Sequence, residues 1–206
     1  MLKMVSPSAI KSVEGINIET LDLINNVSFT SNKCDTNNIT KYNYLFIGNV
    51  VHNYIDYISE NVSHNSALVS SVIANKGNLK DTTKPTNEIM ETIYHNIDFS
   101  KSYLDNKNTL IEYQVFYESY KNIIGGTADI VIENDDDTIT IGDFKNYNNP
   151  SSNDLYKHYV QCLIYANLVK LDRGKEIREI EIVYPSQEQV ITLPYQDIDL
   201  DKVRYG

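Results

Sequence analysis

Residues 122–145 read NIIGGTADIVIENDDDTITIGDFK, two apolar segments separated by an acidic run. The segments 122–132 and 138–145 are rich in isoleucine and threonine, which favour extended backbone. Asparagine and aspartate at 134–137 are typical of a turn. The pattern therefore predicts a β-hairpin with its turn at the acidic run.

Further strands and helices are expected on both sides of this hairpin. A third strand is predicted at 109–117, and a strong helix at about 154–171 precedes strands at 177–184 and 189–193. Apolar residues repeat at steps of three and four over 44–58, which predicts an amphipathic helix. The resulting order, α-βββ-α-β, predicts an α/β fold with helices packed on a mixed central sheet.

These patterns divide the chain into an N-terminal segment and one main domain. The length of 206 residues fits one domain, or one domain with a modest appendage. Residues 1–42 are expected to be an irregular segment, and 43–206 to form the domain. An insertion is expected at about 63–100, with loop or partly helical residues at 63–86 and a short helix at 88–97.

Composition narrows the class of protein. The 18 Lys and Arg against 28 Asp and Glu give a formal net charge of −10, which argues against coating of nucleic acid through bulk charge. No apolar run approaches the ~20 residues of a membrane helix, and the start lacks a secretory signal. Cys34 and Cys162 cannot build a disulfide framework or a four-cysteine iron–sulfur site. We therefore expect a cytoplasmic protein, in the host cytoplasm if a phage encodes it, with no membrane partner.

Polar residues in the hairpin strands are candidates for a metal site. Asp143 and Lys145 are two residues apart on one predicted strand, so both side chains emerge on one face. Asp129 lies on the partner strand, close to level with them. Carboxylates are the ligands that Mg²⁺ and Mn²⁺ prefer, and a neighbouring lysine can position or deprotonate the attacking water. A solvated strand face is the ordinary alternative, and the apolar strand around Asp143 weighs against it.

Short motifs in this region resemble those of a nuclease superfamily. They are Gly126-Thr-Ala-Asp129, Asp143-Phe-Lys145 and Gln161-Cys-Leu-Ile-Tyr165, preceded by Gly48-Asn-Val-Val-His52 on the first predicted helix. In this order they are similar to motifs of the PD-(D/E)XK superfamily, in its RecB-like and Cas4-like exonuclease branch, which resembles the mitochondrial genome maintenance exonuclease. The resemblance covers about residues 44–184 and implies a restriction-endonuclease-like α-βββ-α-β core.

The resemblance implies a metal site. Asp129 and Asp143 would hold one or two Mg²⁺ or Mn²⁺ ions, and His52, Glu112 and the backbone carbonyl of Phe144 would complete the ligand set. Without the resemblance, a single helix histidine such as His52 is more often structural. Glu112 is about equally well explained as an exposed strand residue.

The resemblance also implies roles for residues beside the metal. Lys145 would activate or position the water, while Gln161 and Tyr165 would order Lys145 or contact the DNA backbone. An amphipathic helix with a polar edge is the alternative for Gln161, and core packing the alternative for Tyr165. Asn146 stands where the branch commonly has threonine after the lysine. This departure puts in doubt only a secondary contact of the motif, and the roles of Asp143 and Lys145 are unaffected. The cysteine cluster of some relatives is missing, so no iron–sulfur cluster is expected.

The expected function is therefore a Mg²⁺- or Mn²⁺-dependent deoxyribonuclease. It would act as an exonuclease on DNA ends or single strands in replication, recombination or repair, and a phage or viral origin is compatible with this. A helicase, a polymerase or a single-strand-binding protein would be a candidate partner. Two alternatives remain open: an RNA endonuclease of the cap-snatching type, and a catalytically inactive nuclease-fold module that serves binding or assembly.

Overall fold

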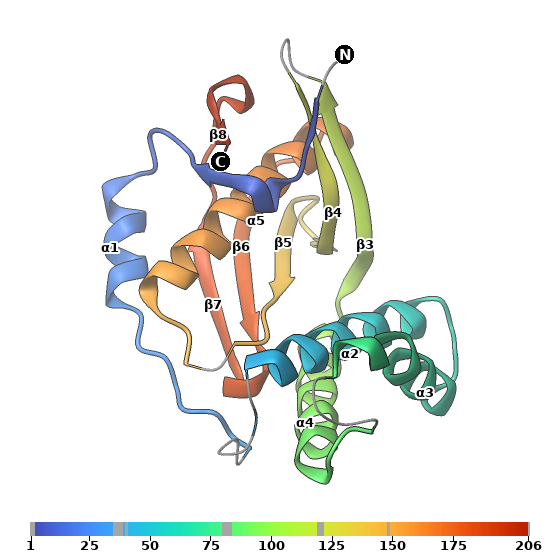
Figure 1. The fold of residues 1–206 in the computed structure, drawn as a ribbon. Coiled ribbons are helices and arrows are strands. Elements are labelled where there is room, and N and C mark those ends of the chain that lie inside the picture. The colour runs from blue at the N-terminus through green and yellow to red at the C-terminus, as the bar shows by residue number, and fades with distance from the viewer. Residues whose placement is uncertain are drawn as a thin grey trace.

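Six strands form one mixed sheet in the computed structural model, which describes residues 3–34, 39, 41–79, 84–118, 122–147 and 149–205. The strands are β1 Lys3–Val5, β3 Asn108–Glu118, β4 Asn122–Glu133, β5 Ile139–Phe144, β6 Ile177–Tyr184 and β7 Gln189–Pro194. The strand order is β1-β4-β5-β6-β7, and β3 pairs with β4 as well (Figure 1).

The predicted hairpin is confirmed as the antiparallel pair β4 and β5. Ile130 pairs with Gly142 and Glu133 with Ile139, and the amide of Asn134 donates to the carbonyl of Thr138 at 2.9 Å to close the turn. β3 runs antiparallel to β4 along its length, whereas β5 and β6 are parallel. A parallel pair needs a crossover connection, which the helix between these two strands supplies.

Helices cover both faces of this sheet. Within the described residues the α-helices are α1 Ile18–Asn26, α2 Lys41–Ser59, α3 His64–Asn75, α4 Asn87–Leu104 and α5 Ser152–Arg173. One cluster of buried apolar side chains lies between the sheet and α5, and a second lies between the opposite face and α2 and α4 (Figure 1). The sheet therefore separates two cores, as expected for an α/β fold with helices on a mixed sheet.

The helix α5 has clear start and stop signals. Ser151 and Asp154 form a capping box, in which each side chain accepts from the backbone amide of the other residue. Gly174 ends the helix in the left-handed conformation, with φ 64°. The helix therefore extends two residues beyond the predicted 154–171 at each end, because its caps lie outside the apolar stretch.

The first 42 residues differ from the irregular segment expected. Their described part contains β1, the short helix η1 Pro7–Ala9, the strand β2 Ile10–Ser12 and α1. β1 joins the main sheet parallel to β4, and β2 pairs with β8 Arg204–Tyr205 near the other end of the chain. Figure 1 shows this segment passing over α5, which explains why α5 is buried on its outer side as well as against the sheet.

The region of the expected insertion, about 63–100, is largely helical. It holds α3, the short helix η2 Lys76–Asn78 and most of α4, between α2 and β3 (Figure 1). α4 runs on to Leu104, beyond the predicted 88–97, because Ser100 is buried and Phe99 and Tyr103 continue the packed face. Among the described residues, no helix combines the length and apolarity that crossing a membrane requires.

Candidate metal centre

The predicted metal ligands lie where β3, β4 and β5 approach α2. The register of β3 and β4 pairs Ile111 with Ile130 and Tyr113 with Ala128, which sets Glu112 opposite Asp129. The ladder between β4 and β5 ends at the pair Ile130 and Gly142, one residue after Asp129 on β4 and one residue before Asp143 on β5. Neighbouring strands therefore bring three carboxylates from separate parts of the sequence to one place in the sheet.

The alternation of the strands shifts at this place. Ala128 packs in the core beneath α5, whereas Ile130, two residues on, packs in the core beneath α2 and α4. Tyr113 and Ile111 on β3 show the same change of face, although residues two apart normally share a face. Glu112 lies at the shift with φ 51°, in the left-handed region that residues other than glycine rarely adopt. Strained backbone of this kind clusters at active sites and ligand-binding sites, which makes Glu112 a candidate functional residue.

One ligand atom each from His52, Glu112 and Asp129 lies within 4.8 Å of the others. The Nδ1 atom of His52 is 3.6 Å from Asp129 Oδ2 and 3.8 Å from Glu112 Oε1. Two carboxylates and an imidazole form a mixed oxygen and nitrogen donor set that suits Mn²⁺ and, through the oxygens, Mg²⁺. These three residues could therefore hold a divalent cation.

The backbone of Phe144 orients two of these ligands. Its carbonyl oxygen lies 3.0 Å from His52 Nε2, and its amide donates to Asp129 Oδ2 at 3.1 Å. Because a carbonyl only accepts, Nε2 must carry the proton, which leaves Nδ1 to face the carboxylates. Phe144, predicted as a metal ligand through its carbonyl, thus uses that carbonyl here to orient the histidine.

The charge of His52 depends on its acidic neighbours. Burial lowers the pKa of the imidazole, but the neighbouring carboxylates of Asp129 and Glu112 outweigh it and raise the pKa to about 9. At neutral pH the ring is therefore a cation between two carboxylates. A metal ion bound at Nδ1 would have to displace this proton.

Asp143 and Lys145 form a buried ion pair next to the three ligands. Lys145 Nζ donates to Asp143 Oδ1 at 2.9 Å and lies 2.8 Å from Oδ2, while Asp143 is only 2% exposed. Burial raises the pKa of Asp143 to about 6, because the opposing effect of Lys145 is smaller than that of desolvation, and Asp129 adds to the rise. Burial lowers the pKa of Lys145, but Asp143 and Asp129 outweigh it and raise it above its ordinary value. Lys145 therefore stays protonated at neutral pH.

The buried carboxylate of Asp143 is compensated by one ammonium group. Lys145 Nζ lies 2.8 Å from its Oδ2 and 2.9 Å from its Oδ1, so both oxygens face the same cation. Without such a cation, a buried carboxylate would be costly. The Asp143 side chain lies outside the group of three mutually close ligands.

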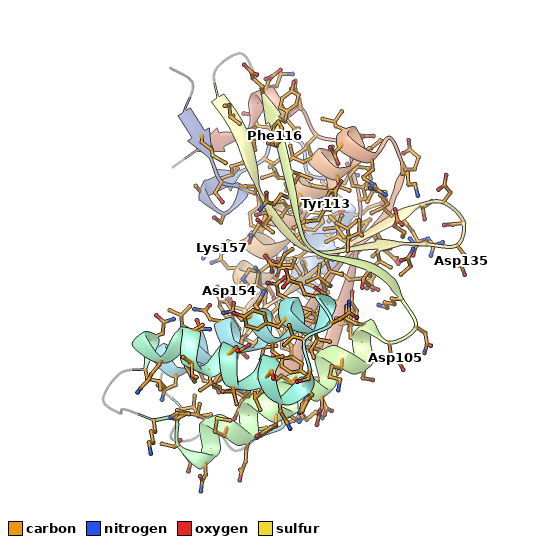
Figure 2. All side chains as sticks on the ribbon, turned by 90° about the vertical axis from the view of Figure 1, so that its right-hand side faces the viewer. Asp105, Tyr113, Phe116, Asp135, Asp154 and Lys157 are labelled. Atoms are coloured by element: carbon orange, nitrogen blue, oxygen red, sulfur yellow. The ribbon has the colours of Figure 1, made fainter. Side chains whose placement is uncertain are left out.

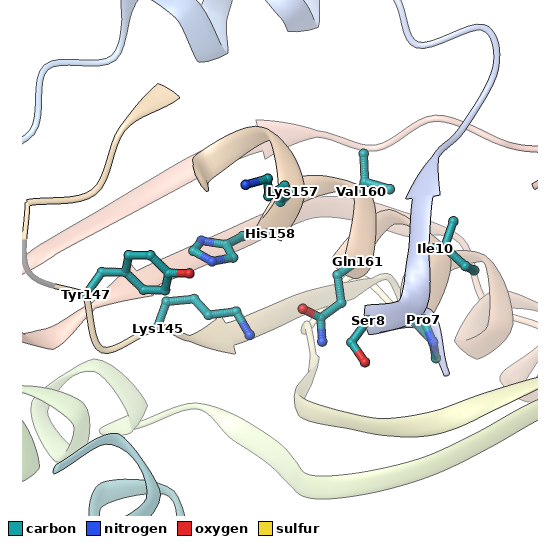
Figure 3. Close-up of a pocket in the computed structure, with 9 residues that line it drawn as sticks. All are labelled: Pro7, Ser8, Ile10, Lys145, Tyr147, Lys157, His158, Val160 and Gln161. Carbon is teal, nitrogen blue, oxygen red and sulfur yellow. The ribbon is translucent and has the colours of Figure 1, made fainter. Parts of the chain in front are cut away.

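The two predicted residues on α5 have different surroundings. Tyr165 is 5% exposed, and a Cβ added at Gly126 would lie 2.8 Å from its hydroxyl oxygen. Burial raises the pKa of Tyr165 to about 12, although the neighbouring Gln161 side chain lowers it. Gln161 instead lines an open hollow together with Lys145 (Figure 3). The glycine of the Gly126 motif thus makes room for Tyr165, and Gln161 is the residue that a ligand can reach.

Asn146 has a clear structural role that its position in the motif did not reveal. Its amide donates to the carbonyl of Tyr44 at 2.7 Å, and its side-chain oxygen accepts from Asn96 at 2.8 Å and Ser186 at 2.7 Å. A Cβ added at Gly48 would lie 3.2 Å from the Asn146 Cβ. Asn146 therefore ties α2 and α4 to the chain that leaves β5, directly beside Lys145.

His158 is a second neighbour of the site that the sequence motifs did not identify. It is buried, its Nδ1 lies 2.9 Å from the Tyr184 hydroxyl, and its ring meets Tyr147 edge to face at 4.9 Å between centroids. Burial and the charge of Lys145 lower its pKa to about 4, so the ring is neutral at physiological pH. Its position three residues before Gln161 on α5 was the signal available in the sequence.

The acidic run 134–137 lies away from these residues. Figure 2 shows Asp135 at the tip of the β4–β5 turn, well apart from Asp154 and Lys157 on α5. Its neighbours are paired with cations: Lys175 Nζ lies 2.9 Å from Asp137, and Arg178 Nη2 lies 2.5 Å from Asp136. The run is thus a solvent-exposed turn held to the start of β6.

Comparisons with known proteins leave the family of the chain open. No family model and no curated protein sequence matches it. Among solved structures, one described as "Crystal structure of SSO0001" aligns with 73% of this chain and 67% of its own, at 17% identity and a TM-score of 0.36. Neither the sequence comparisons nor this distant structural likeness assigns a function to the chain.

Proposed function

We propose that this chain is a Mg²⁺- or Mn²⁺-dependent nuclease with a restriction-endonuclease-like core, which hydrolyses phosphodiester bonds in DNA. One observation carries the proposal: His52, Glu112 and Asp129 lie within 4.8 Å of one another, beside the buried ion pair of Asp143 and Lys145. These residues come from α2, β3, β4 and the end of β5, so no local pattern accounts for their meeting. The resemblance of the motifs to the PD-(D/E)XK superfamily assigns the same residues to metal binding and catalysis.

The metal would be held by Asp129, Glu112 and His52 Nδ1, with Asp143 as the further ligand that the motif resemblance implies. When bound, it would neutralise charge on the phosphate and lower the pKa of a bound water. The Phe144 backbone keeps His52 and Asp129 in place through the two hydrogen bonds described above. The ligand set is thus supported by backbone groups, which most side-chain substitutions would leave in place.

Lys145 would act as a positioning and charge-stabilising group. Since Asp143 and Asp129 raise its pKa, the ammonium keeps its proton at neutral pH and donates hydrogen bonds to the attacking water or to a phosphate oxygen. Asp143 holds the ammonium through both carboxylate oxygens, at 2.9 and 2.8 Å. General-base catalysis by Lys145 would first require loss of that proton, which the two carboxylates oppose.

A cleavage assay tests this proposal. The purified chain is incubated with Mn²⁺ or Mg²⁺ and end-labelled single-stranded DNA, duplex DNA and RNA of one sequence, with and without blocked ends. We expect metal-dependent cleavage of DNA that Lys145→Ala and Asp129→Asn abolish. Asp135→Asn at the exposed turn is the matched control and should cleave as the wild type does.

Each other outcome has a distinct meaning. Cleavage of RNA alone would favour the cap-snatching alternative, whose active site also combines a histidine, carboxylates and a lysine. Binding of Mn²⁺ without cleavage of any substrate would favour the inactive binding module. Full activity of a folded Lys145→Ala variant would exclude the catalytic assignment.

A further inference from the structure

A hollow of about 640 Å³ lies beside the candidate metal centre, between η1 and the first half of α5 (Figure 3). Its polar and aromatic lining consists of Ser8, Lys145, Tyr147, Lys157, His158 and Gln161. The volume falls in the range of about 300–1,000 Å³ that is usual for small-molecule sites. Because Lys145 belongs to both the hollow and the candidate metal centre, a ligand in this α5 hollow would adjoin the reacting group.

The charge of the α5 hollow contrasts with that of the whole protein. The chain carries a net charge of −10, yet the described residues that line the hollow include two lysines and no carboxylate. Lys157 is only loosely held: its side chain is 62% exposed, and its Nζ lies 3.9 Å from Asp154 Oδ1. Asp154 is itself engaged with Ser151 in the capping box of α5. An anion entering the hollow would therefore meet two ammonium groups and no carboxylate among the lining residues: Lys145, which is paired with the buried Asp143, and the loosely held Lys157.

The hollow also presents an aromatic ring and apolar surface. Tyr147 is 39% exposed, and its ring is supported edge to face by the buried ring of His158. Pro7, Ile10 and Val160 form the apolar part of the lining. Nucleic acid bases stack on exposed aromatic rings with little regard to sequence, while lysines follow the phosphate backbone.

We infer that the α5 hollow binds one unpaired nucleotide of a DNA or RNA strand, next to the phosphate held at the metal centre. The phosphate of this nucleotide would contact Lys157 and the hydroxyl of Ser8, and its base would lie against Tyr147. A base that is paired and stacked in a duplex would have to leave its stack to enter. The inference deepens the proposed nuclease function and rests on it, and it assigns strand binding to η1, in the segment expected to be irregular.

Fluorescence anisotropy tests the inference without catalysis. The full chain is titrated, in EDTA at low salt, against a labelled DNA single strand, the RNA of the same sequence and a blunt DNA duplex. We expect tighter binding of the single strands than of the duplex, and about tenfold weaker single-strand binding by Tyr147→Ala. Lys157→Ala should weaken single-strand binding several-fold and reduce its dependence on salt concentration.

Matched variants separate this role from a general loss of charge or stability. Tyr94→Ala and Lys101→Ala remove exposed residues of the same types from α4 and should bind as the wild type does. Tyr147→Phe keeps the aromatic ring and Lys157→Arg keeps the positive charge. Both variants should therefore bind single strands almost as tightly as the wild type. The relative affinities for DNA and RNA show which strand the hollow accepts.

The results can overturn the inference independently of the proposed function. Wild-type affinity in both Tyr147→Ala and Lys157→Ala, or no preference for single strands, would exclude the hollow as a strand site even if the enzyme cuts DNA. A wild-type chain that binds single strands through these residues, but cleaves nothing in Mn²⁺, would instead reject the nuclease function and leave the binding site in place.

Discussion

The two ends of the β4–β5 hairpin carry acidic side chains in contrasting surroundings. At the turn, Asp136 and Asp137 are exposed and paired with Arg178 and Lys175, and hydrogen bonds from Thr138 and Arg178 lower the pKa of Asp136 to about 2. At the open end, Asp143 is buried and its pKa is raised to about 6. The turn is the more conspicuous acidic feature of the sequence, but its carboxylates are already neutralised by cations in water.

The contrast shows how a carboxylate that can bind a metal differs from one that stabilises a turn. An exposed pair gains little free energy from its partner, because water and salt screen the charges. The buried carboxylate of Asp143 keeps a raised pKa even beside Lys145, because desolvation outweighs that ion pair, so it has more to gain from a further cation such as a metal. The first two predictions below make matched substitutions near the turn and at the site, and the other two test the packing and the histidine of the site.

The largest difference in cleavage rate is expected when aspartate is replaced by asparagine at each end of the hairpin in turn. Asp143→Asn removes the counter-charge of Lys145 and should lower the cleavage rate by about 10²–10³-fold, the usual cost of a misplaced electrostatic group in a catalytic site. Asp136→Asn should leave the rate unchanged. Initial cleavage rates in Mn²⁺ measure both effects, and thermal unfolding verifies that the variants fold. Equal rates for the two variants would contradict the difference between the carboxylates at the two ends of the hairpin.

The affinity for Mn²⁺ should depend on the glutamate at the site but not on a glutamate near the turn. Glu112→Gln keeps the size of the side chain but removes a charged ligand, so the Kd for Mn²⁺ should rise by about 10- to 100-fold. Glu133→Gln, next to the turn and paired with Arg173, should bind Mn²⁺ as the wild type does. Isothermal titration calorimetry measures both, and unchanged affinity in Glu112→Gln would exclude Glu112 as a ligand.

Close packing at the site should be visible in stability. A Cβ at Gly126 would lie 2.8 Å from the Tyr165 hydroxyl oxygen and 3.3 Å from Pro7, whereas a Cβ at Gly77 would meet nothing within 4 Å. Gly126→Ala should therefore lower the free energy of unfolding by about 1–3 kcal/mol, and Gly77→Ala should not. Adding Tyr165→Phe, which deletes the hydroxyl, should recover part of the loss in urea denaturation. If it recovers nothing, the contact with Tyr165 is not the cause.

The last prediction concerns the effect of pH on metal binding, which changes the affinity gradually and removes no ligand. The pKa of His52 is raised to about 9, so below that value a metal ion must displace a proton from Nδ1. The affinity for Mn²⁺ should therefore rise by up to about tenfold per pH unit between neutral pH and pH ~9, and fall as the pH is lowered. His52→Gln should flatten this dependence. Calorimetry in buffers of different ionisation enthalpy counts the protons released, and the absence of proton release would contradict metal binding at His52.

Local sequence patterns predicted most of the strands and helices in the second half of the chain. The alternation and turn residues around Asn134 predicted the hairpin, and α5 was predicted from its apolar stretch and Gly174. These features depend on residues within a few positions of one another. The first 42 residues were expected to be irregular because β1, β2 and α1 are short and stabilised by distant parts of the chain.

For the candidate site, the sequence determined which residue types are available and on which elements they lie. Spacing predicted that Asp143 and Lys145 share a face, and they form an ion pair. Only the tertiary structure decided that Glu112 takes the left-handed conformation opposite Asp129, and that the Phe144 carbonyl orients His52. It also decided that η1 and α5 enclose a hollow next to Lys145. The physical reason is that periodicity and caps arise from neighbours in sequence, whereas these contacts require two or more distant segments to be packed at once.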